Sequence, residues 1–146
     1  YLMNPEVKIF GRALLHEYKQ ILCRMLPDKY QGNFYEKADG DFILICTEDR
    51  WCVFESSQHS VTKLAQLKQY KTLTCGFSSY DTLVLSSSTP EQAVVSLQRQ
   101  IQSISGQVLE PGDFLIKKSV EYSDTAVLLC VAVLLLLDQK QAVFEF

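Results

Sequence analysis

Residues 126–137 read AVLLCVAVLLLL, an uninterrupted apolar run that ends abruptly at Asp138-Gln139-Lys140. A helix of these twelve residues is about 18 Å long, whereas the hydrocarbon core of a bilayer is about 30 Å thick. A helix that is apolar on every side and too short to cross a membrane is typical of the centre of a protein core. We therefore predict a buried central helix near residues 124–138, and we expect no membrane contact.

Strand and helix patterns alternate along the rest of the chain. DFILIC at 41–46 is typical of a strand buried on both faces, and WCVFE at 51–55 follows a polar corner, either as a hairpin partner or before a loop. Residues 60–70 favour a short helix. Five further segments favour strands, at residues 71–77, 81–85, 107–109, 114–116 and 142–146.

The N-terminal segment has the spacing of an amphipathic helix. Asn4 is a candidate N-cap with Pro5 in the first turn, and apolar residues then recur every three or four positions up to Met25. The polar stretch 31–40, with two glycines, reads as a connector. We predict one helix over residues 5–25.

Residues 89–104 support two interpretations. Ser88 or Thr89 can cap a helix that has Pro90 in its first turn, and Val94, Leu97, Ile101 and Ile104 then form a stripe. Alternate residues from 95 to 101 also fit a strand. We favour the helix, which makes Ser86-Ser87-Ser88 a loop and cap, and we leave the strand open.

The composition fits a single domain spanning residues 1–146. Of these residues 47% are hydrophobic and 21% are charged, with a formal net charge of −3. That length buries a sizeable core, and the alternation of elements predicts an α/β or α+β fold with a mixed, mostly buried sheet packed by helices. The basic residues form no stripe, so we expect no nucleic-acid binding.

The five cysteines are Cys23, Cys46, Cys52, Cys75 and Cys130. Their number is odd, no Cys-x-x-Cys pair is present, and several lie in apolar runs. We predict that all five are reduced, and we expect a cytoplasmic location.

Phosphate and metal motifs are weak. The six glycines form no phosphate-binding loop. Gly76-Phe77-Ser78-Ser79 could bind an anion, but we interpret it as an ordinary turn after a strand. Cys46, Cys52 and His59 would supply only three ligands for zinc, so we interpret them as packed cysteines and a surface histidine. We expect no metal and no cofactor.

Acidic and nucleophilic groups also lack a convergent pattern. Asp39 and Asp41 precede the strand at 41–46, and Glu48-Asp49 follow it, so we expect the two groups at opposite ends. Pro27-Asp28 with Glu36-Lys37 departs from nuclease spacing, since Glu and Lys are adjacent. His16 is expected near the polar edge of its helix, and we assign no catalytic residue.

Three stretches carry a resemblance to a known family. FILICTED at 42–49 is similar to a strand that ends in an acidic turn near a nucleotide, and KTLTCGF at 71–77 is similar to a later strand that ends in glycine. With the turn at 110–113 and TAVLLCVAVLLLL at 125–137, they resemble the central ATP-binding domain of Mur ligases, which form amide bonds in peptidoglycan. The resemblance implies a strand at 94–104. The family's glycine-rich phosphate loop is absent, so the resemblance implies a degenerate domain.

Two functions are carried forward, and a third, a small hydrolase or nuclease that uses the carboxylates, would need at least two acids in a shared cleft. The first is a non-catalytic cytoplasmic binding or assembly module, with a protein partner or a second copy of the chain as the expected contact. The alternative is a degenerate Mur-ligase-like, nucleotide-related domain that lacks its phosphate loop.

Overall fold

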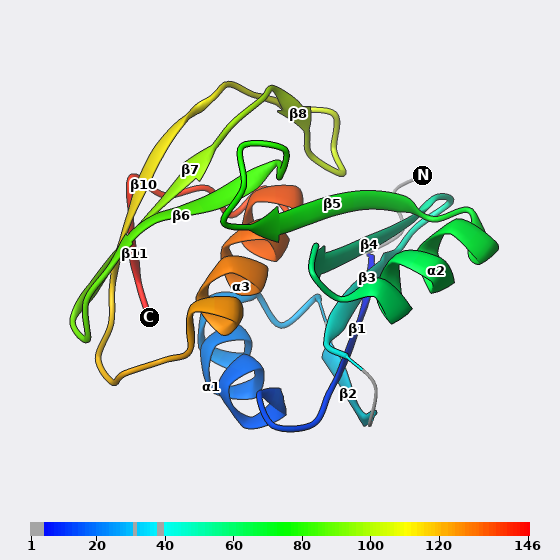
Figure 1. Ribbon diagram of the computed structural model, residues 1–146, viewed down its shortest axis with the longest axis horizontal. Coiled ribbons are helices and arrows are strands. Elements are labelled where there is room, and N and C mark those ends of the chain that lie inside the picture. The colour runs from blue at the N-terminus through cyan, green and yellow to red at the C-terminus, as the bar shows by residue number, and fades with distance from the viewer. Residues whose placement is uncertain (1–4, 31, 38–39) are drawn as a thin grey trace.

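The described part of the protein contains a mixed sheet of nine strands. Figure 1 shows the computed structural model. The structure describes residues 5–30, 32–37 and 40–146. The strand order is β11-β10-β7-β6-β5-β4-β3-β1-β2, and β8 and β9 form a separate two-stranded sheet. The elements of the first half are β1 (Glu6–Gly11), α1 (Leu15–Met25), β2 (Gly32–Glu36), β3 (Phe42–Cys46), β4 (Arg50–Glu55), α2 (His59–Lys68) and β5 (Lys71–Gly76). Those of the second half are β6 (Leu83–Ser88), β7 (Gln92–Leu97), β8 (Ile101–Gln102), β9 (Val108–Leu109), β10 (Gly112–Lys117), α3 (Asp124–Leu136) and β11 (Val143–Glu145).

Each of these helices connects two neighbouring parallel strands. Helix α1 lies between β1 and β2, α2 between β4 and β5, and α3 between β10 and β11. Strands β1 and β4 are parallel to each other. Strand β2, which follows α1, lies beside β1 toward one edge of the sheet, whereas β5, which follows α2, lies beside β4 toward the other edge. Right-handed crossovers then require α1 and α2 on opposite faces of the sheet. The structure has this arrangement, because Tyr18 and Ile21 of α1 belong to the large apolar cluster and Val61 of α2 belongs to the small one.

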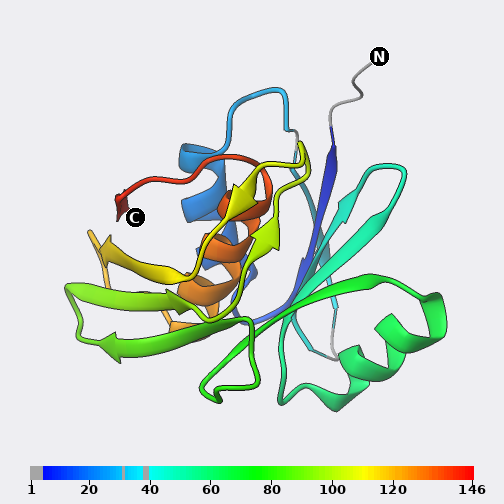
Figure 2. The ribbon, with the colours of Figure 1, turned by 90° about the horizontal axis from the view of Figure 1, so that it is seen from above.

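Helix α3 is the centre of the large cluster. Every residue from Ala126 to Leu137 is fully buried, and α3 contacts β3, β4, β5, β6 and α1. The two halves of the sheet flank it in Figures 1 and 2. Ser123 caps its first turn by accepting a hydrogen bond from the Ala126 N–H at 3.3 Å. The predicted central helix is therefore confirmed, as is the mixed α/β fold in one domain. In the described part of the chain, no helix has the length and apolarity needed to span a bilayer.

The expected helix over residues 5–25 is wrong in its first part. Residues 6–11 form strand β1, in which Val7 and Ile9 face the large cluster, and the helix begins only at Leu15. The expected connector at 31–40 contains strand β2, which pairs with β1. The proposed cap Asn4 lies outside the described residues, as do Gln31, Ala38 and Asp39.

The expected helix over residues 89–104 is also wrong. Strand β7 occupies its first half, and Ala93, Val95 and Leu97 alternate into the large cluster. Strand β8 follows, so the strand interpretation holds here. Ser86–Ser88 are the end of β6, paired with β7, and are not a loop or a helix cap. The hairpin of β3 and β4 and the helix α2 agree with their predicted positions.

Candidate functional site

The residues considered for zinc do not converge. Cys46 and Cys52 lie on the neighbouring strands β3 and β4 and pack in or against the small apolar cluster beneath α2. His59 is exposed at the start of α2. Among the described residues, no group of three or more His, Cys, Asp and Glu is placed to hold a metal ion.

The carboxylates are distributed as expected. Asp41 lies just before β3, and Glu48 and Asp49 lie in the turn after it, with the length of the strand between them. Asp28 lies in the loop before β2, whereas Glu36 is the last residue of β2. His16 is exposed on α1. All five cysteines are free thiols in the structure.

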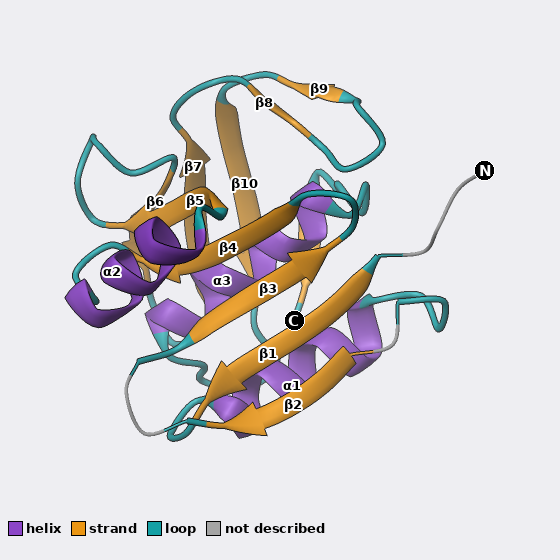
Figure 3. Ribbon diagram, turned by 90° about the vertical axis from the view of Figure 1, so that its right-hand side faces the viewer, coloured by secondary structure: helices purple, strands orange, loops and turns teal. Residues whose placement is uncertain are grey.

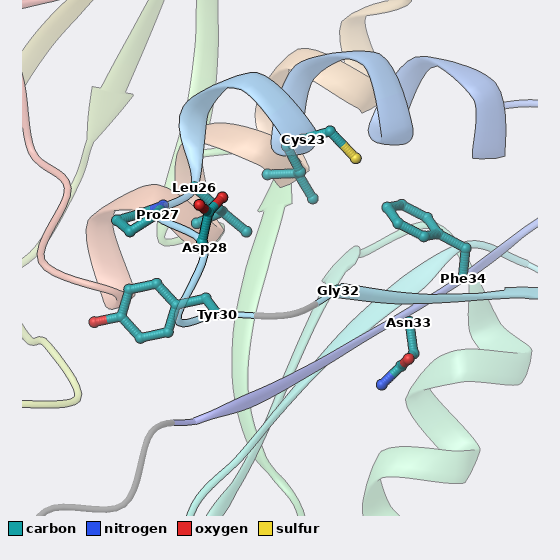
Figure 4. Close-up of a pocket in the computed structure, with 9 residues that line it drawn as sticks. Cys23, Leu26, Pro27, Asp28, Tyr30, Gly32, Asn33 and Phe34 are labelled. Atoms are coloured by element: carbon teal, nitrogen blue, oxygen red, sulfur yellow. The ribbon is translucent and has the colours of Figure 1, made fainter.

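One cavity lies between the C-terminal turn of α1 and strand β2 (Figure 4). Its volume is about 420 Å³, and its walls include Cys23, Asp28, Asn33 and Phe34. In Figure 4 the Phe34 ring and the Cys23 thiol face each other, while Asn33 points away from α1 and the Asp28 carboxylate lies beside Leu26. Its polar groups therefore do not converge on one point.

A second cavity of about 420 Å³ lies at the carboxyl ends of the parallel strands β4 and β5, where α2 stands in front of the sheet (Figure 3). Ligands of α/β proteins characteristically bind outside this end of parallel strands. We call it the hydroxyl cavity, because six of the residues lining it carry hydroxyl groups. Its lining residues are Phe54, Ser56, Thr62, Ala65, Gln66, Thr72, Thr74, Ser78, Tyr80 and Asp81.

The sequence pattern explains why the hydroxyl cavity is polar on one side. Strand β5 alternates, so Leu73 and Cys75 face α3 while Thr72 and Thr74 face the side of α2. Helix α2 covers β3 and β4 through the small apolar cluster and leaves the outer face of β5 to these threonines.

Among the described residues, Asp81 is the one charged side chain that lines the hydroxyl cavity, and it is only 3% exposed. It lies in the loop between β5 and β6, where its Oδ2 accepts a hydrogen bond from the Ser78 backbone N–H at 3.3 Å. Gly76 makes room for it. A Cβ atom at position 76 would overlap the Asp81 carboxylate and would lie 3.1 Å from Ser56 Oγ. The missing side chain thus brings the carboxylate close to the end of β5.

The electrostatic environment at this end of the sheet is negative. Burial raises the pKa of the Cys75 thiol well above its usual value, and the charges of Asp81 and Glu55 raise it further. Glu55 also accepts hydrogen bonds from the N–H and the hydroxyl of Ser57. In the part of the chain that the structure describes, no lysine or arginine lines the hydroxyl cavity.

The loop from Phe77 to Thr82 is held in place by Arg99, which follows β7. Its guanidinium donates one hydrogen bond to the Tyr80 carbonyl at 2.9 Å and a second to the Ser79 carbonyl at 3.2 Å. The Asp81 N–H also donates to the Ser78 carbonyl at 2.9 Å. This fixed loop leaves Phe77 62% and Tyr80 87% exposed. Two exposed aromatics on one ordered loop are a candidate contact for a partner.

Sequence reasoning found part of this site and missed its charged residue. The turn Gly76-Phe77-Ser78-Ser79 was considered for an anion and does form one wall of the hydroxyl cavity through Ser78. Asp81 was interpreted only as the start of a strand. The available signal is an aspartate five residues after the glycine that ends a strand, at the end of a short loop rich in serine.

Comparisons of the chain with protein-family models, with curated proteins and with solved structures give no match.

Proposed function

We propose that this protein is a binding module without a catalytic centre of its own, and that the hydroxyl cavity is its ligand site. The observation that carries the proposal is the buried carboxylate of Asp81 among six hydroxyl-bearing residues at the carboxyl ends of β4 and β5. A concave site with a few convergent polar groups and apolar walls is the usual form of a small-ligand site.

Among the described residues, no hydroxyl that lines the cavity donates a hydrogen bond to Asp81, the one carboxylate there, and this supports binding over catalysis. A hydroxyl nucleophile needs an adjacent general base, most often a histidine. The hydroxyl cavity is lined by no histidine, lysine or cysteine, and the hydrogen bond to Asp81 Oδ2 comes from a backbone N–H.

Nuclear magnetic resonance titration of the ¹⁵N-labelled protein tests the binding function. The probes are single-ring organic molecules with a polar tail, in cationic, neutral and anionic forms. We expect at least one to bind with a Kd of about 1 mM or below and to shift the amide signals of Ser56, Thr74 and Tyr80. Thr74→Met narrows the cavity and should weaken that binding, whereas Asn33→Met, in the cavity of Figure 4, is the matched control. Saturable binding that is unaffected by Thr74→Met would refute the proposed site.

The exposed aromatics of the same loop provide the contact proposed for a protein partner or a second copy of the chain. Phe77 and Tyr80 would be buried on assembly, and aromatic side chains dominate such interfaces. Sedimentation equilibrium of the protein and of a Phe77→Ser, Tyr80→Ser variant tests self-association. If the double variant associates as strongly as the parent, this loop is not the contact between copies.

The nucleotide-related alternative has one specific observation in its favour. Strand β7 lies where the Mur ligase resemblance implies a strand, and the glycine-ended strand β5 reaches the hydroxyl cavity. The lining residues argue against a phosphate group there, because they include the Asp81 carboxylate and no lysine or arginine. We therefore rank this function second.

A further inference from the structure

One hydrogen bond is described for the Asp81 carboxylate. Asp81 is only 3% exposed to solvent. Its Oδ2 accepts a hydrogen bond from the Ser78 N–H at 3.3 Å, which is a long distance for such a bond. A carboxylate can accept about four hydrogen bonds, and a buried charge is costly unless it is paired. The ion pairs among the described residues do not include Asp81. The nearby Arg99 donates to two backbone carbonyls of the loop.

The groups around Asp81 are hydrogen-bond acceptors as well as donors. Asp81 Oδ2 and Ser56 Oγ are both among the atoms nearest to the position that a Cβ of Gly76 would take, and the Asp81 carboxylate occupies that position. Thr74 lines the same cavity from β5. An ammonium group carries three donors and no acceptor, so a carboxylate with two hydroxyl oxygens matches it. An anionic group would meet the Asp81 charge without any lysine or arginine to offset it.

The opposite wall of the hydroxyl cavity suits an apolar body. Phe54 and Ala65 line it, and Tyr80 is a largely exposed ring at its rim. An aromatic ring attracts a cation through its face and packs against an aryl or alkyl group. A volume of about 420 Å³ accommodates a small organic molecule.

We infer that the hydroxyl cavity selects a primary ammonium group on a small apolar body, with Asp81 as the charge partner of the ligand. The inference rests on the binding function proposed above and adds the chemical class of the ligand. The ammonium can belong to a free amine or to the side chain of a lysine in a peptide, and the two sources share the same recognition at Asp81.

Titration of the labelled full chain with matched probes tests the inference. The probes are 2-phenylethylamine, 2-phenylethanol and 3-phenylpropionate, which differ mainly in the charge of the tail. Nα-acetyl-lysine methylamide represents a lysine side chain. We expect an ammonium probe to bind at least about tenfold more tightly than the alcohol, as one charge-assisted hydrogen bond allows. We also expect the carboxylate probe to bind most weakly.

Substitution of Asp81 tests whether the preference for the ammonium depends on the charge of the site or only on its shape. Asp81→Asn should remove the preference for the ammonium over the alcohol, while Asp28→Asn, in the cavity of Figure 4, should leave it unchanged. The fold of each variant is checked by its amide spectrum. If Asp81→Asn does not fold, Ser56→Ala replaces it, with the expectation of a several-fold loss for the ammonium probe alone.

The outcomes distinguish the two proposals. Equal binding of the alcohol and the ammonium probe at Ser56 and Thr74 would overturn the inference and leave the binding function standing. Binding of no probe at the hydroxyl cavity would overturn both. A preference for phenylethylamine or for the lysine derivative supports the inference in either case and identifies the source of the ammonium.

Discussion

Tyr18 of α1 and Asp41 before β3 meet at Gly11 of β1, where a Cβ atom would lie 2.7 Å from Asp41 Oδ1 and 3.3 Å from the Tyr18 ring. Burial raises the pKa of the Tyr18 hydroxyl, and the Asp41 charge raises it further. Burial also raises the pKa of Asp41, although the neighbouring Tyr18 hydroxyl and the Arg12 backbone oppose that effect. The glycine thus allows a half-buried acid to face a buried phenol.

The raised pKa of Asp41 predicts a pH dependence of stability. The folded chain binds this proton more tightly than the unfolded chain, whose Asp has a pKa of about 3.9. The stabilisation from the protonated form is complete below that value and is lost as the pH rises through the higher folded pKa. Asp41→Asn should therefore be more stable than the parent at pH 7, with an advantage that shrinks toward pH 4. Urea unfolding at several pH values measures this, with the exposed Asp28→Asn as control. A difference that does not change with pH would contradict the prediction.

Helix α3 predicts a large cost for cavities in its centre. Leu129 and Leu134 are fully buried, so their replacement by Ala should lower the free energy of unfolding by about 2–5 kcal/mol. Typical domains have about 5–15 kcal/mol in total, so either variant should be marginal. Gln141 is exposed, and Gln141→Ala should change stability by less than about 0.5 kcal/mol. Urea unfolding without detergent measures all three, and parental stability of both leucine variants would show that α3 is not core. The sequence alone suggests Gln139 as an exposed control. The structure rules it out, because Gln139 is half-buried and its N–H donates to the Leu134 carbonyl at 2.8 Å.

The thiols should react in the order of their exposure. Cys23 is exposed and Cys46 is half-buried, whereas Cys52, Cys75 and Cys130 are buried. Burial raises the pKa of Cys52 to about 12, which leaves little of the reactive thiolate at pH 8. A disulfide reagent such as 5,5′-dithiobis(2-nitrobenzoate) should therefore modify Cys23 first, Cys46 more slowly, and the other three only after unfolding. Cys23→Ser should lose the fast phase. Fewer than five reactive thiols in unfolded protein that was never reduced would reveal a disulfide.

Arg99 should control the order of the loop at 77–82. Arg99→Met removes two charge-assisted hydrogen bonds to the Ser79 and Tyr80 carbonyls, which together contribute more than about 1.4 kcal/mol. Opening of the loop should become at least about tenfold more frequent, and chymotrypsin should cleave after Phe77 or Tyr80 correspondingly faster. Arg50→Met, at an exposed position in β4, is the control. Equal cleavage rates of the two variants would show that Arg99 does not hold the loop.

Nucleotide binding should be weak. A chain without a glycine-rich phosphate loop should bind Mg-ATP no better than about millimolar. Isothermal titration calorimetry of the full chain measures this directly. A one-site micromolar constant would promote the nucleotide-related function above the one proposed here.

The parts of the fold that were predictable are those whose pattern has one interpretation. The run at 126–137 and the strand residues 42–45 are buried, and their sequences have no polar side that would indicate a different element. The segments at 6–11 and 92–97 were misinterpreted because apolar residues at both two- and three-residue spacings satisfy either pattern. Pairing with β3 and β2 decides the first, and pairing with β6 and β10 decides the second. Strands β3, β2 and β10 are distant in sequence from the segments they pair with, and β6 pairs with β7 across a short turn, so the periodicity within either segment does not contain the information.

The candidate site was less predictable than the fold. Its walls come from β4, α2, β5 and the loop at 77–82, and only the parallel pairing of β4 with β5 brings them together. The role of Asp81 depends on Gly76 through a close approach that depends on the bend of the chain between them. Arg99 reaches that loop from the end of a strand that the sequence presented as a helix.

The position of α3 along the chain has a consequence for synthesis on the ribosome. Strands β3 to β6, which pack against this helix, are all made before it, so their inner apolar faces emerge with nothing to cover them. Exposed apolar strands are prone to aggregate until their partner arrives. The nascent chain is therefore expected to form its core only after residue 136 has left the exit tunnel. A chaperone that binds apolar segments would have the most time to bind the strands β3 to β6.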